Sequence, residues 1–392
     1  MIEFEEENDS QIEPDSSEKI DEGYPLKTFD PRDIDISVEQ QNIDFLLYKM
    51  EYDLAKLEDD DDFDPNSGII DLNTEFQRSQ DLWSQVQMSR LIESILIRFP
   101  LPAFYFDTSN KKKWQVIDGL QRLSTIRKFI IEQEEPLRLK GLEFLDREKF
   151  ENKTFAELPE PMQRTIRNAQ VILILIRQGT PKEVKYRIFE RVNTGGLKLN
   201  KQEIRHAINQ GKAAKYLKEL AELEIFKTLT RINSRRMDDR ELCLRFLAFK
   251  LKTFDMYQPP MYNFLDTAME EVGRITDSKR ETLKNEFING LQVIENLLGE
   301  NAFSRQVFED STKKRKLNKA VFECLITCAS NLTKTESEKL LTEKKRFIEG
   351  YKIVLSDAKY VDSISIHTSD KQAIKDRFDL VTELINSIVH DK

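Results

Sequence analysis

The sequence predicts an α+β protein in which a small domain with a mixed sheet precedes an all-helical domain. Its 392 residues contain 12 glycines, about half the usual share, which argues against a large doubly wound sheet. Short apolar runs typical of strands lie before residue 177, whereas apolar residues recur with helical periodicity from about residue 214 to the end. We therefore divide the chain into residues 1–64, 65–210 and 211–392.

The first segment, residues 1–64, is an acidic lead. Residues 1–30 are rich in Glu, Asp and Ser and poor in apolar residues, which predicts a largely disordered stretch. Apolar residues between 36 and 57 predict one helix. The acidic run at 58–62 has two interpretations. It is either solvated chain or a mimic of nucleic acid that covers a basic groove of the same molecule.

The formal net charge of −9 is the sum of two opposite parts. Residues 1–70 hold 23 acidic and 5 basic residues, a net of −18, and the other 322 residues hold 47 acidic and 56 basic residues, a net of +9. A basic body indicates a phosphate-bearing partner, and we expect DNA. The basic runs at 313–316 and 344–346 are candidates for contacts with its phosphates.

The second segment, residues 65–210, predicts strands interspersed with helices. The apolar run at 171–176 is continuous, which predicts a central strand buried on both faces. Asn200, followed three residues later by Glu203, predicts the start of a further helix. The other expected strands span residues 68–72, 103–106 and 114–117, and the other expected helices span residues 79–97, 120–131 and 181–192.

Several classes of protein are excluded by what the sequence lacks. No apolar stretch approaches the roughly 18 residues of a membrane span, and the N-terminus is acidic where a signal peptide would be basic. The three cysteines, Cys243, Cys324 and Cys328, have no zinc-binding spacing, and we expect Cys324 and Cys328 in a helical core. We therefore expect a cytoplasmic protein with no membrane partner. Neither common glycine-rich nucleotide motif occurs.

The residues most indicative of chemistry lie between 114 and 125. A strand, an Asp118-Gly119 pair and an immediate helix place backbone N–H groups at a helix N-terminus, where anions bind. Gly119 would let a ligand approach the backbone, and Arg122 offers a planar group that fits phosphate. Asp118 is a candidate to hold Mg²⁺ or, with Gln121, to orient a water beside a triphosphate. Ser124 and Thr125 add hydroxyl groups. The alternative is an ordinary turn with Asp118 as the helix N-cap.

Two further elements would complete such a phosphate site. The first is Gln77-Arg78, followed by Trp83, at the mouth of a helix. The second is a turn that exposes backbone amides after the expected helix at 181–192. Its candidate binding residues are Arg191, Asn193, Thr194 and Gly195.

Together, the three elements resemble the N-terminal domain family of GmrSD-type restriction enzymes, which is related to ParB and sulfiredoxin. The resemblance covers residues 65–210 and departs from the family's Asp-Gly-Gln-Gln-Arg signature where Leu120 replaces the first Gln. It implies a ParB/sulfiredoxin-like fold, nucleotide binding and triphosphate hydrolysis in defence against phage DNA. Because a Leu stands at the position of sulfiredoxin's reactive cysteine, sulfinic-acid repair is excluded. Replacing a Gln with Leu120 removes one polar contact, which bears on hydrolysis more than on binding.

The resulting functional hypothesis is a triphosphate-binding, hydrolysing component of a bacterial restriction-type defence system. The site would take a nucleoside triphosphate with Mg²⁺ at Asp118. The C-terminal half lacks the paired His and Asn residues of the family's HNH nuclease domain, so a separately encoded nuclease or effector would complete the system. Two alternatives stay open: a non-hydrolysing DNA-binding adaptor that recruits a nuclease, and a DNA nickase that uses the same domain.

Overall fold

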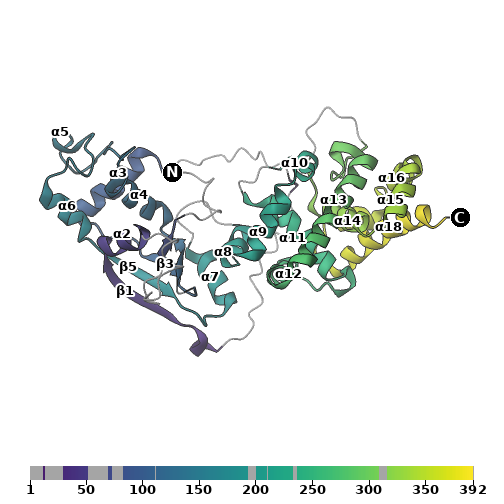
Figure 1. Cartoon of the computed structure of the whole chain (residues 1–392), viewed down its shortest axis with the longest axis horizontal. Coiled ribbons are helices and arrows are strands. Elements are labelled where there is room, and N and C mark those ends of the chain that lie inside the picture. Colours follow the sequence, from purple (N-terminus) through teal and green to yellow (C-terminus); the bar gives the residue numbers. More distant parts are fainter. Residues whose placement is uncertain are drawn as a thin grey trace. The chain divides into compact units, whose positions relative to one another are not determined.

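The computed structural model describes residues 12–13, 30–51, 69–72, 83–110, 112–192, 200–209, 211–232, 236–308 and 316–391. The chain separates into two compact units, residues 24–199 and residues 200–392, the second of which includes the N-terminal 23 residues (Figure 1). The first unit contains a five-stranded sheet, and the described part of the second is almost entirely helical. The predicted α+β class is confirmed.

The sheet of the first unit has the strand order β1-β5-β3-β4-β2. β5 pairs antiparallel with β1 and parallel with β3, β3 pairs antiparallel with β4, and β4 pairs parallel with β2. The sheet is therefore mixed, and β5, which was predicted to be central, is an interior strand between β1 and β3. The strands are β1 Ile36–Asn42, β2 Ile69–Asp71, β3 Phe104–Asp107, β4 Lys113–Asp118 and β5 Gln170–Ile176.

The predicted helix over residues 36–57 is wrong in its first third. Residues 36–42 form β1, and helix α2 occupies Ile43–Glu51. Every residue of β1 has a partner in β5, from Ile36 opposite Ile176 to Asn42 opposite Gln170. This pairing joins segments more than 120 positions apart, so local periodicity could not indicate it. Residues 52–68, which include the acidic run at 58–62, lie outside the described residues.

Helices cover one face of the sheet. In Figure 1, α2, α3, α4 and α6 lie on the same side of the strands, and their apolar residues join those of the strands in one core. α3 begins after Ser84, whose side chain forms a capping box with Gln87. The helices are α3 Gln85–Leu96, α4 Leu120–Ile130, α5 Arg147–Phe150, α6 Glu160–Arg167 and α7 Lys182–Val192.

The prediction that residues 171–176 are buried on both faces is wrong for the first half of the strand, although Ile176 at its end is fully buried. Ile172 is 47% exposed, and Val38 of the adjacent β1 is 69% exposed. These side chains lie on the face opposite to the buried Val171 and Leu173, where the helices do not cover the sheet. An apolar run therefore predicted a strand correctly, but it did not predict how much of the sheet the helices would cover.

α7 is attached to the sheet by a buried ion pair. The Nζ atom of Lys185 lies 2.9 Å from Oδ2 of Asp107, at the end of β3, and also donates to the hydroxyl group of Ser109. Lys185 and Asp107 are each 8% exposed. This contact fixes the helix whose last turn contains Arg191.

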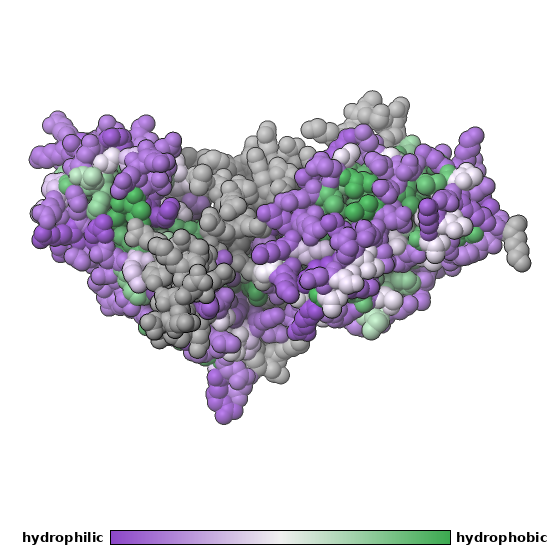
Figure 2. All heavy atoms as spheres, in the orientation of Figure 1, coloured by the Kyte–Doolittle hydropathy of each residue, from purple (hydrophilic) through white to green (hydrophobic). Residues whose placement is uncertain are grey.

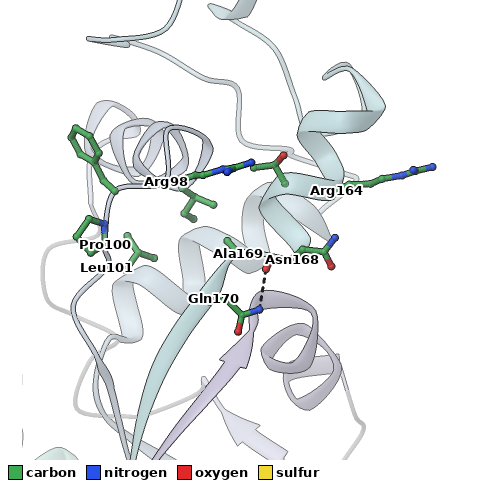
Figure 3. Close-up of a pocket in the computed structure, with 10 residues that line it drawn as sticks. Arg98, Pro100, Leu101, Arg164, Asn168, Ala169 and Gln170 are labelled. Carbon is green, nitrogen blue, oxygen red and sulfur yellow. Dashed lines mark hydrogen bonds between the residues drawn. The ribbon is translucent and has the colours of Figure 1, made fainter.

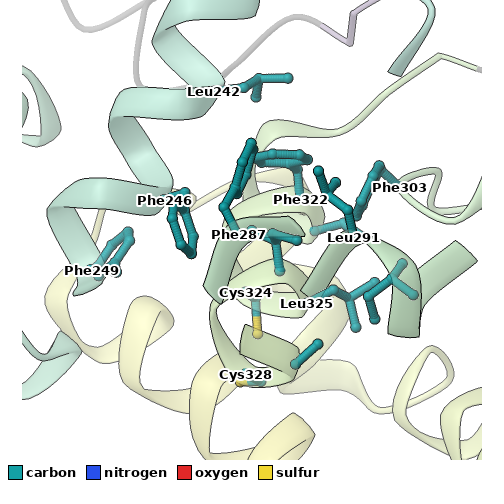
Figure 4. Close-up of a cluster of buried hydrophobic side chains, with 14 of the residues drawn as sticks. Leu242, Phe246, Phe249, Phe287, Leu291, Phe303, Phe322, Cys324, Leu325 and Cys328 are labelled. Atoms are coloured by element: carbon teal, nitrogen blue, oxygen red, sulfur yellow. The ribbon is translucent and has the colours of Figure 1, made fainter. Parts of the chain in front are cut away.

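The helical unit is built on α14, whose residues are all buried. α14 packs against α11, α13 and α18, and Figure 4 shows the apolar side chains around it, with Cys324 and Cys328 among them. Both cysteines are buried, as predicted for a helical core. The helices are α8 Lys201–Ile208, α9 Lys212–Ala221, α10 Glu224–Thr230, α11 Asp238–Leu251, α12 Met261–Arg274, α13 Asp277–Leu298, α14 Lys319–Ser330, α15 Lys334–Thr342, α16 Lys344–Val354, α17 Ala358–Ser365 and α18 Lys371–Val389. Short 3₁₀ turns lie at Pro31–Asp33, Phe254–Met256 and Gly299–Asn301.

Two residues of the acidic lead contact this unit. Ile12 is buried and forms a parallel bridge with Leu317, and the N–H of Glu13 donates to the carbonyl of Leu317 at 2.8 Å. The Glu13 carboxylate pairs with Arg305 at 2.7 Å and accepts a hydrogen bond from Asn318. Of the other residues predicted to be disordered, 1–11 and 14–29 lie outside the described residues, whereas Asp30 is the N-cap of the 3₁₀ turn Pro31–Asp33.

A network of buried charges crosses the helical core. Glu323 of α14 accepts from Arg245 of α11 at 2.9 Å and from Arg377 of α18. Arg245 also donates to Glu241 at 2.9 Å, and Lys319 lies 3.2 Å from the same carboxylate. Because each buried charge has an opposite partner, the network is tolerated in an apolar core.

The Glu241 carboxylate should make this unit sensitive to acid. Burial alone would raise the pKa of Glu241, but Lys319 and Arg245 lower that pKa to about 2. A carboxyl group with a lowered folded-state pKa contributes stability above its unfolded pKa of roughly 4.3 and loses it as the pH falls. We expect Glu241 to contribute on the order of 3 kcal/mol at neutral pH, lost between about pH 5 and pH 2. Denaturant unfolding across this range checks it: Glu241→Gln should flatten the dependence on pH, and an unchanged slope would contradict the assignment.

The surface is mainly hydrophilic. Figure 2 shows polar residues over most of the described surface, with smaller apolar patches on both units. None of the described helices combines the length and apolar composition that crossing a lipid bilayer requires.

Candidate functional site at the β4–α4 corner

The predicted strand–turn–helix element is present. Asp118 is the last residue of β4, Gly119 is the N-cap of α4, and the helix begins at Leu120. Gly119 has φ +99° and ψ +8°, a conformation that side-chain-bearing residues rarely adopt. A Cβ atom at this position would lie 2.5 Å from Cδ1 of Phe104. Both the backbone and the packing therefore require glycine.

Arg122 is held inside this corner by three acceptors. Its guanidinium group donates to the carbonyl groups of Pro102 and Ala103, the latter at 3.1 Å, and to Oδ2 of Asp118 at 2.6 Å. It also lies 4.4 Å from the centre of the Phe104 ring. Arg122 is only 7% exposed. It therefore ties the first turn of α4 to the segment that leads into β3.

Asp118 is less enclosed than its partner. Its side chain is 32% exposed, compared with 9% for that of Arg122. Burial raises the pKa of Asp118 above its usual value, although Arg122 and the N–H group of Gly119 oppose this effect. The same burial lowers the pKa of Arg122. The corner thus presents a carboxylate that is fixed on one side by an arginine and partly open on the other.

The N-terminus of α4 has backbone donors next to this carboxylate. No side chain caps the helix, and its first intrahelical hydrogen bond runs from the Leu123 N–H to the Gly119 carbonyl. The N–H groups of residues 120–122 precede that bond and are the usual anion-binding groups of a helix. The alternative in which Asp118 is the N-cap is wrong, because Gly119 occupies that position.

The other predicted residues of α4 differ in their surroundings. Gln121 and Ser124 are half-buried, while Thr125 is buried and donates its hydroxyl hydrogen to the Gln121 carbonyl at 2.7 Å. Leu120 is 9% exposed and packs in the core of the sheet unit. The residue that replaces the family's Gln is thus a core residue.

Most of the two outer elements lies outside the described part of the chain. This applies to Gln77, Arg78, Asn193, Thr194 and Gly195. Arg191 is described and lies exposed in the last turn of α7. Of the basic runs predicted to contact phosphates, Lys316 and residues 344–346 are exposed, and 313–315 lie outside the described residues.

Sequence reasoning missed the residues that hold Arg122. Ala103 and Phe104 belong to a segment predicted only as a strand, and Pro102 directly precedes it. Tyr105 lies opposite Asp118 in the β3–β4 register. Only one feature of the sequence could have indicated that these residues surround Arg122. Two apolar runs joined by a short turn usually form an antiparallel pair of strands. The end of one such strand lies beside the start of the other.

The comparison with known proteins concerns the unit that contains this corner. Residues 63–209 match the family model described as the GmrSD restriction endonuclease, N-terminal domain. This segment belongs to that domain family. The searches of curated proteins and of solved structures found no match to the chain. The GmrSD-type segment includes the Asp118–Arg122 corner and α7.

Mg²⁺ fits this corner only as an ion that arrives with a phosphate ligand. Among the described residues, no group of three or more His, Cys, Asp and Glu side chains could hold a metal ion. Mg²⁺ is commonly bound through one or two carboxylates together with substrate phosphates and water. The partly open carboxylate of Asp118 meets that requirement.

Proposed function

We propose that the GmrSD-type unit binds and hydrolyses a nucleoside triphosphate as part of a bacterial restriction-type defence system that acts on or senses DNA. The family supports the restriction-type role. The observation that carries the triphosphate site is the Asp118 carboxylate, half-buried and braced by Arg122, directly before the amides of an uncapped helix.

In this proposal both backbone and side-chain groups of the corner bind the triphosphate. The backbone amides of residues 120–122 bind phosphate oxygens, and the positive charge of Arg122 attracts these oxygens to the helix N-terminus. The N–H groups of Arg122 meanwhile keep Asp118 in place. Gln121 supplies a polar group in the first turn of the helix, and Ser124 supplies another one turn later. Arg78, Asn193 and Thr194 would close the site from the outer elements.

Asp118 is the proposed catalytic group. Its exposed side would hold the Mg²⁺ that accompanies the triphosphate or orient the attacking water together with Gln121. Bound Mg²⁺ would neutralise charge on the phosphate oxygens. Because Arg122 donates to Oδ2, the carboxylate keeps one orientation, which is what positioning a water or an ion requires.

The experiment combines binding and turnover on the full chain. Wild-type protein with Mg²⁺ should bind at least one of the four common triphosphates in calorimetry and release phosphate from it, and the Asp118→Ala/Arg122→Ala double variant should bind none. Asp118→Asn, which can still accept from Arg122, should lower phosphate release by about 100-fold or more.

Asp146→Asn is the matched control, because Asp146 also lies at a helix start but caps α5 at an exposed position. It should leave the rate unchanged. Phosphate release by Asp118→Asn at the wild-type rate would refute the catalytic assignment, and binding by the double variant would refute the site.

One observation favours a second candidate, a non-hydrolysing adaptor that binds DNA and recruits a separate nuclease. Leu120 is buried where the family has a polar Gln, so that contact to a bound triphosphate or water is lost. The adaptor predicts triphosphate or DNA binding without phosphate release under any combination of Mg²⁺ and DNA.

A further inference from the structure

A groove lies between the C-terminal ends of α3 and α6 in the sheet unit (Figure 3). It has a volume of about 500 Å³, within the roughly 300–1,000 Å³ that is usual for ligand sites. One wall is the segment 95–101, which leads directly to the two carbonyl groups that Arg122 binds. The other wall is formed by residues 164–170.

Arg98 on the first wall occupies a position that usually belongs to glycine. α3 ends in a Schellman motif, in which the N–H of Phe99 donates to the Ser94 carbonyl and the N–H of Arg98 donates to the Ile95 carbonyl. Arg98 has φ +61°, a left-handed conformation that costs a residue with a side chain about 1 kcal/mol relative to glycine. Figure 3 shows its side chain extending across the groove toward α6. Strain of this kind is common at functional sites.

An exposed aromatic pair lies at the same wall. Phe99 lines the groove, and its ring centre is 5.6 Å from that of Phe144 in an edge-to-face arrangement. The two residues are 51% and 65% exposed. Large exposed aromatic side chains that adjoin one another mark binding surfaces more often than ordinary surface.

The backbone around Phe144 is fixed by hydrogen bonds to a buried carboxylate. Glu93 of α3 is 2% exposed and accepts hydrogen bonds from the N–H groups of residues 143, 144 and 145 at 2.7–3.0 Å. Burial alone would raise the pKa of Glu93, but these N–H groups hold it below its usual value. The exposed ring therefore extends from a rigid loop, as a pre-organised binding surface requires.

The opposite wall presents groups that can form hydrogen bonds. Asn168 and Gln170 are exposed there, and the Gln170 amide donates to the Asn168 carbonyl at 3.2 Å (Figure 3). Arg164 on this wall pairs with Glu160 at 2.5 Å. Among the described residues, none forms a hydrogen bond or an ion pair with the Arg98 guanidinium group. Its charge is thus available to an anionic ligand.

From these observations we propose that the groove binds an unpaired base of a DNA strand. The base stacks on Phe99 and Phe144, its edge meets the amides of Asn168 and Gln170, and a phosphate of the strand pairs with Arg98. Aromatic faces beside arginine are the usual means of holding unstacked bases. The inference rests on the DNA-directed part of the proposed function and does not require triphosphate hydrolysis.

The test is fluorescence anisotropy of the full chain with labelled 12-nucleotide DNA, without added nucleotide. Three probes separate the sources of an unpaired base: single strand, perfect duplex, and duplex with one unpaired base. The wild type should bind the first and third more tightly than the second. Phe99→Ala should weaken binding of both by about tenfold, with little effect on the perfect duplex.

Arg98→Gly separates binding from folding. Glycine suits φ +61°, so this variant should unfold at a denaturant concentration equal to or higher than that of the wild type, yet bind several-fold more weakly. The slope of the logarithm of its DNA affinity against the logarithm of the salt concentration should become shallower by about one, which corresponds to one counterion fewer released. A residue with a purely structural role would not show both changes.

Three control variants should bind like the wild type: Phe308→Ala, an exposed aromatic of the helical unit, Arg32→Ala, an exposed arginine paired with Asp30, and Asn152→Gly, a second left-handed position. Wild-type affinity in Phe99→Ala or Arg98→Gly, or no preference for an unpaired base, would overturn the inference. Phe99→Ala should leave any phosphate release unchanged, so a chain that hydrolyses nothing but binds DNA through Phe99 would refute the hydrolase and retain the groove.

Discussion

Replacing Glu323 by alanine should destabilise the helical unit by about 3–5 kcal/mol, because the change leaves the buried Arg377 without its counter-charge and leaves Arg245 only the Glu241 carboxylate. Glu323 and Arg377 are fully buried, and Arg245 is 3% exposed. Arg377 would keep its hydrogen bonds to the Ser363 and Thr368 carbonyls, but carbonyl groups do not neutralise a charge. The cost would be a large part of the 5–15 kcal/mol that usually stabilises a folded protein.

The two units can be followed separately in this experiment. Both tryptophans of the chain, Trp83 and Trp114, lie in the sheet unit, so fluorescence reports its unfolding, while far-ultraviolet circular dichroism is dominated by the helical unit. Glu323→Ala should shift the dichroism transition and leave the fluorescence transition near its wild-type position. Glu349→Ala, at an exposed position of α16, should stay within about 0.5 kcal/mol of the wild type.

Glu323→Gln tests whether charge or shape is responsible. The amide keeps the size of the side chain and one acceptor, so its loss of stability should be smaller than that of alanine but still above the exposed control. If Glu323→Ala unfolds at the wild-type midpoint, the buried network does not stabilise the unit, and the interpretation of its geometry fails.

The sequence was sufficient to predict the corner but not what encloses it. The order strand, Asp118-Gly119, helix follows from local patterns, and the structure confirms it. Arg122 was expected to reach outward to a ligand, whereas in the structure its donors are directed to Asp118 and to two carbonyl groups 19 and 20 positions earlier. Those acceptors are beside Arg122 only because β3 pairs with β4, and pairing is a long-range property.

The same reason explains the other differences. Residues 36–42 are a strand because β5 is available as a partner, and Ile172 is exposed because none of the described helices covers that part of the sheet. In the helical unit, Glu323 is 78 positions from Arg245 and 54 from Arg377. Helical periodicity predicted the helices that contain them, but no local pattern indicates which buried charges meet.

Gly119→Ala should be the most damaging small substitution in the sheet unit. An alanine at φ +99° would carry the cost of a left-handed conformation, about 1–2 kcal/mol. Its Cβ would also lie 2.5 Å from Cδ1 and 3.1 Å from Cε1 of the buried Phe104. Because Phe104 has no room to yield in a packed core, we expect a further 1–3 kcal/mol, roughly the cost of overpacking. The fluorescence transition of Trp114, which packs in the same core, would measure the loss.

Gly179 provides the matched control for the backbone cost. It has φ +109°, but a Cβ there would meet no atom within 4 Å, so Gly179→Ala should lose only the conformational part. In a Phe104→Ala background the costs of the two glycine substitutions should become much closer, because the contacts with the ring are gone and only the backbone strain and a 3.2 Å contact with Nη2 of Arg122 remain. Equal costs in the wild-type background would show that the Phe104 ring does not constrain Gly119. Glycine would then be needed at position 119 only for its backbone conformation. The space beside Gly119 would be open, as it must be if a ligand binds there.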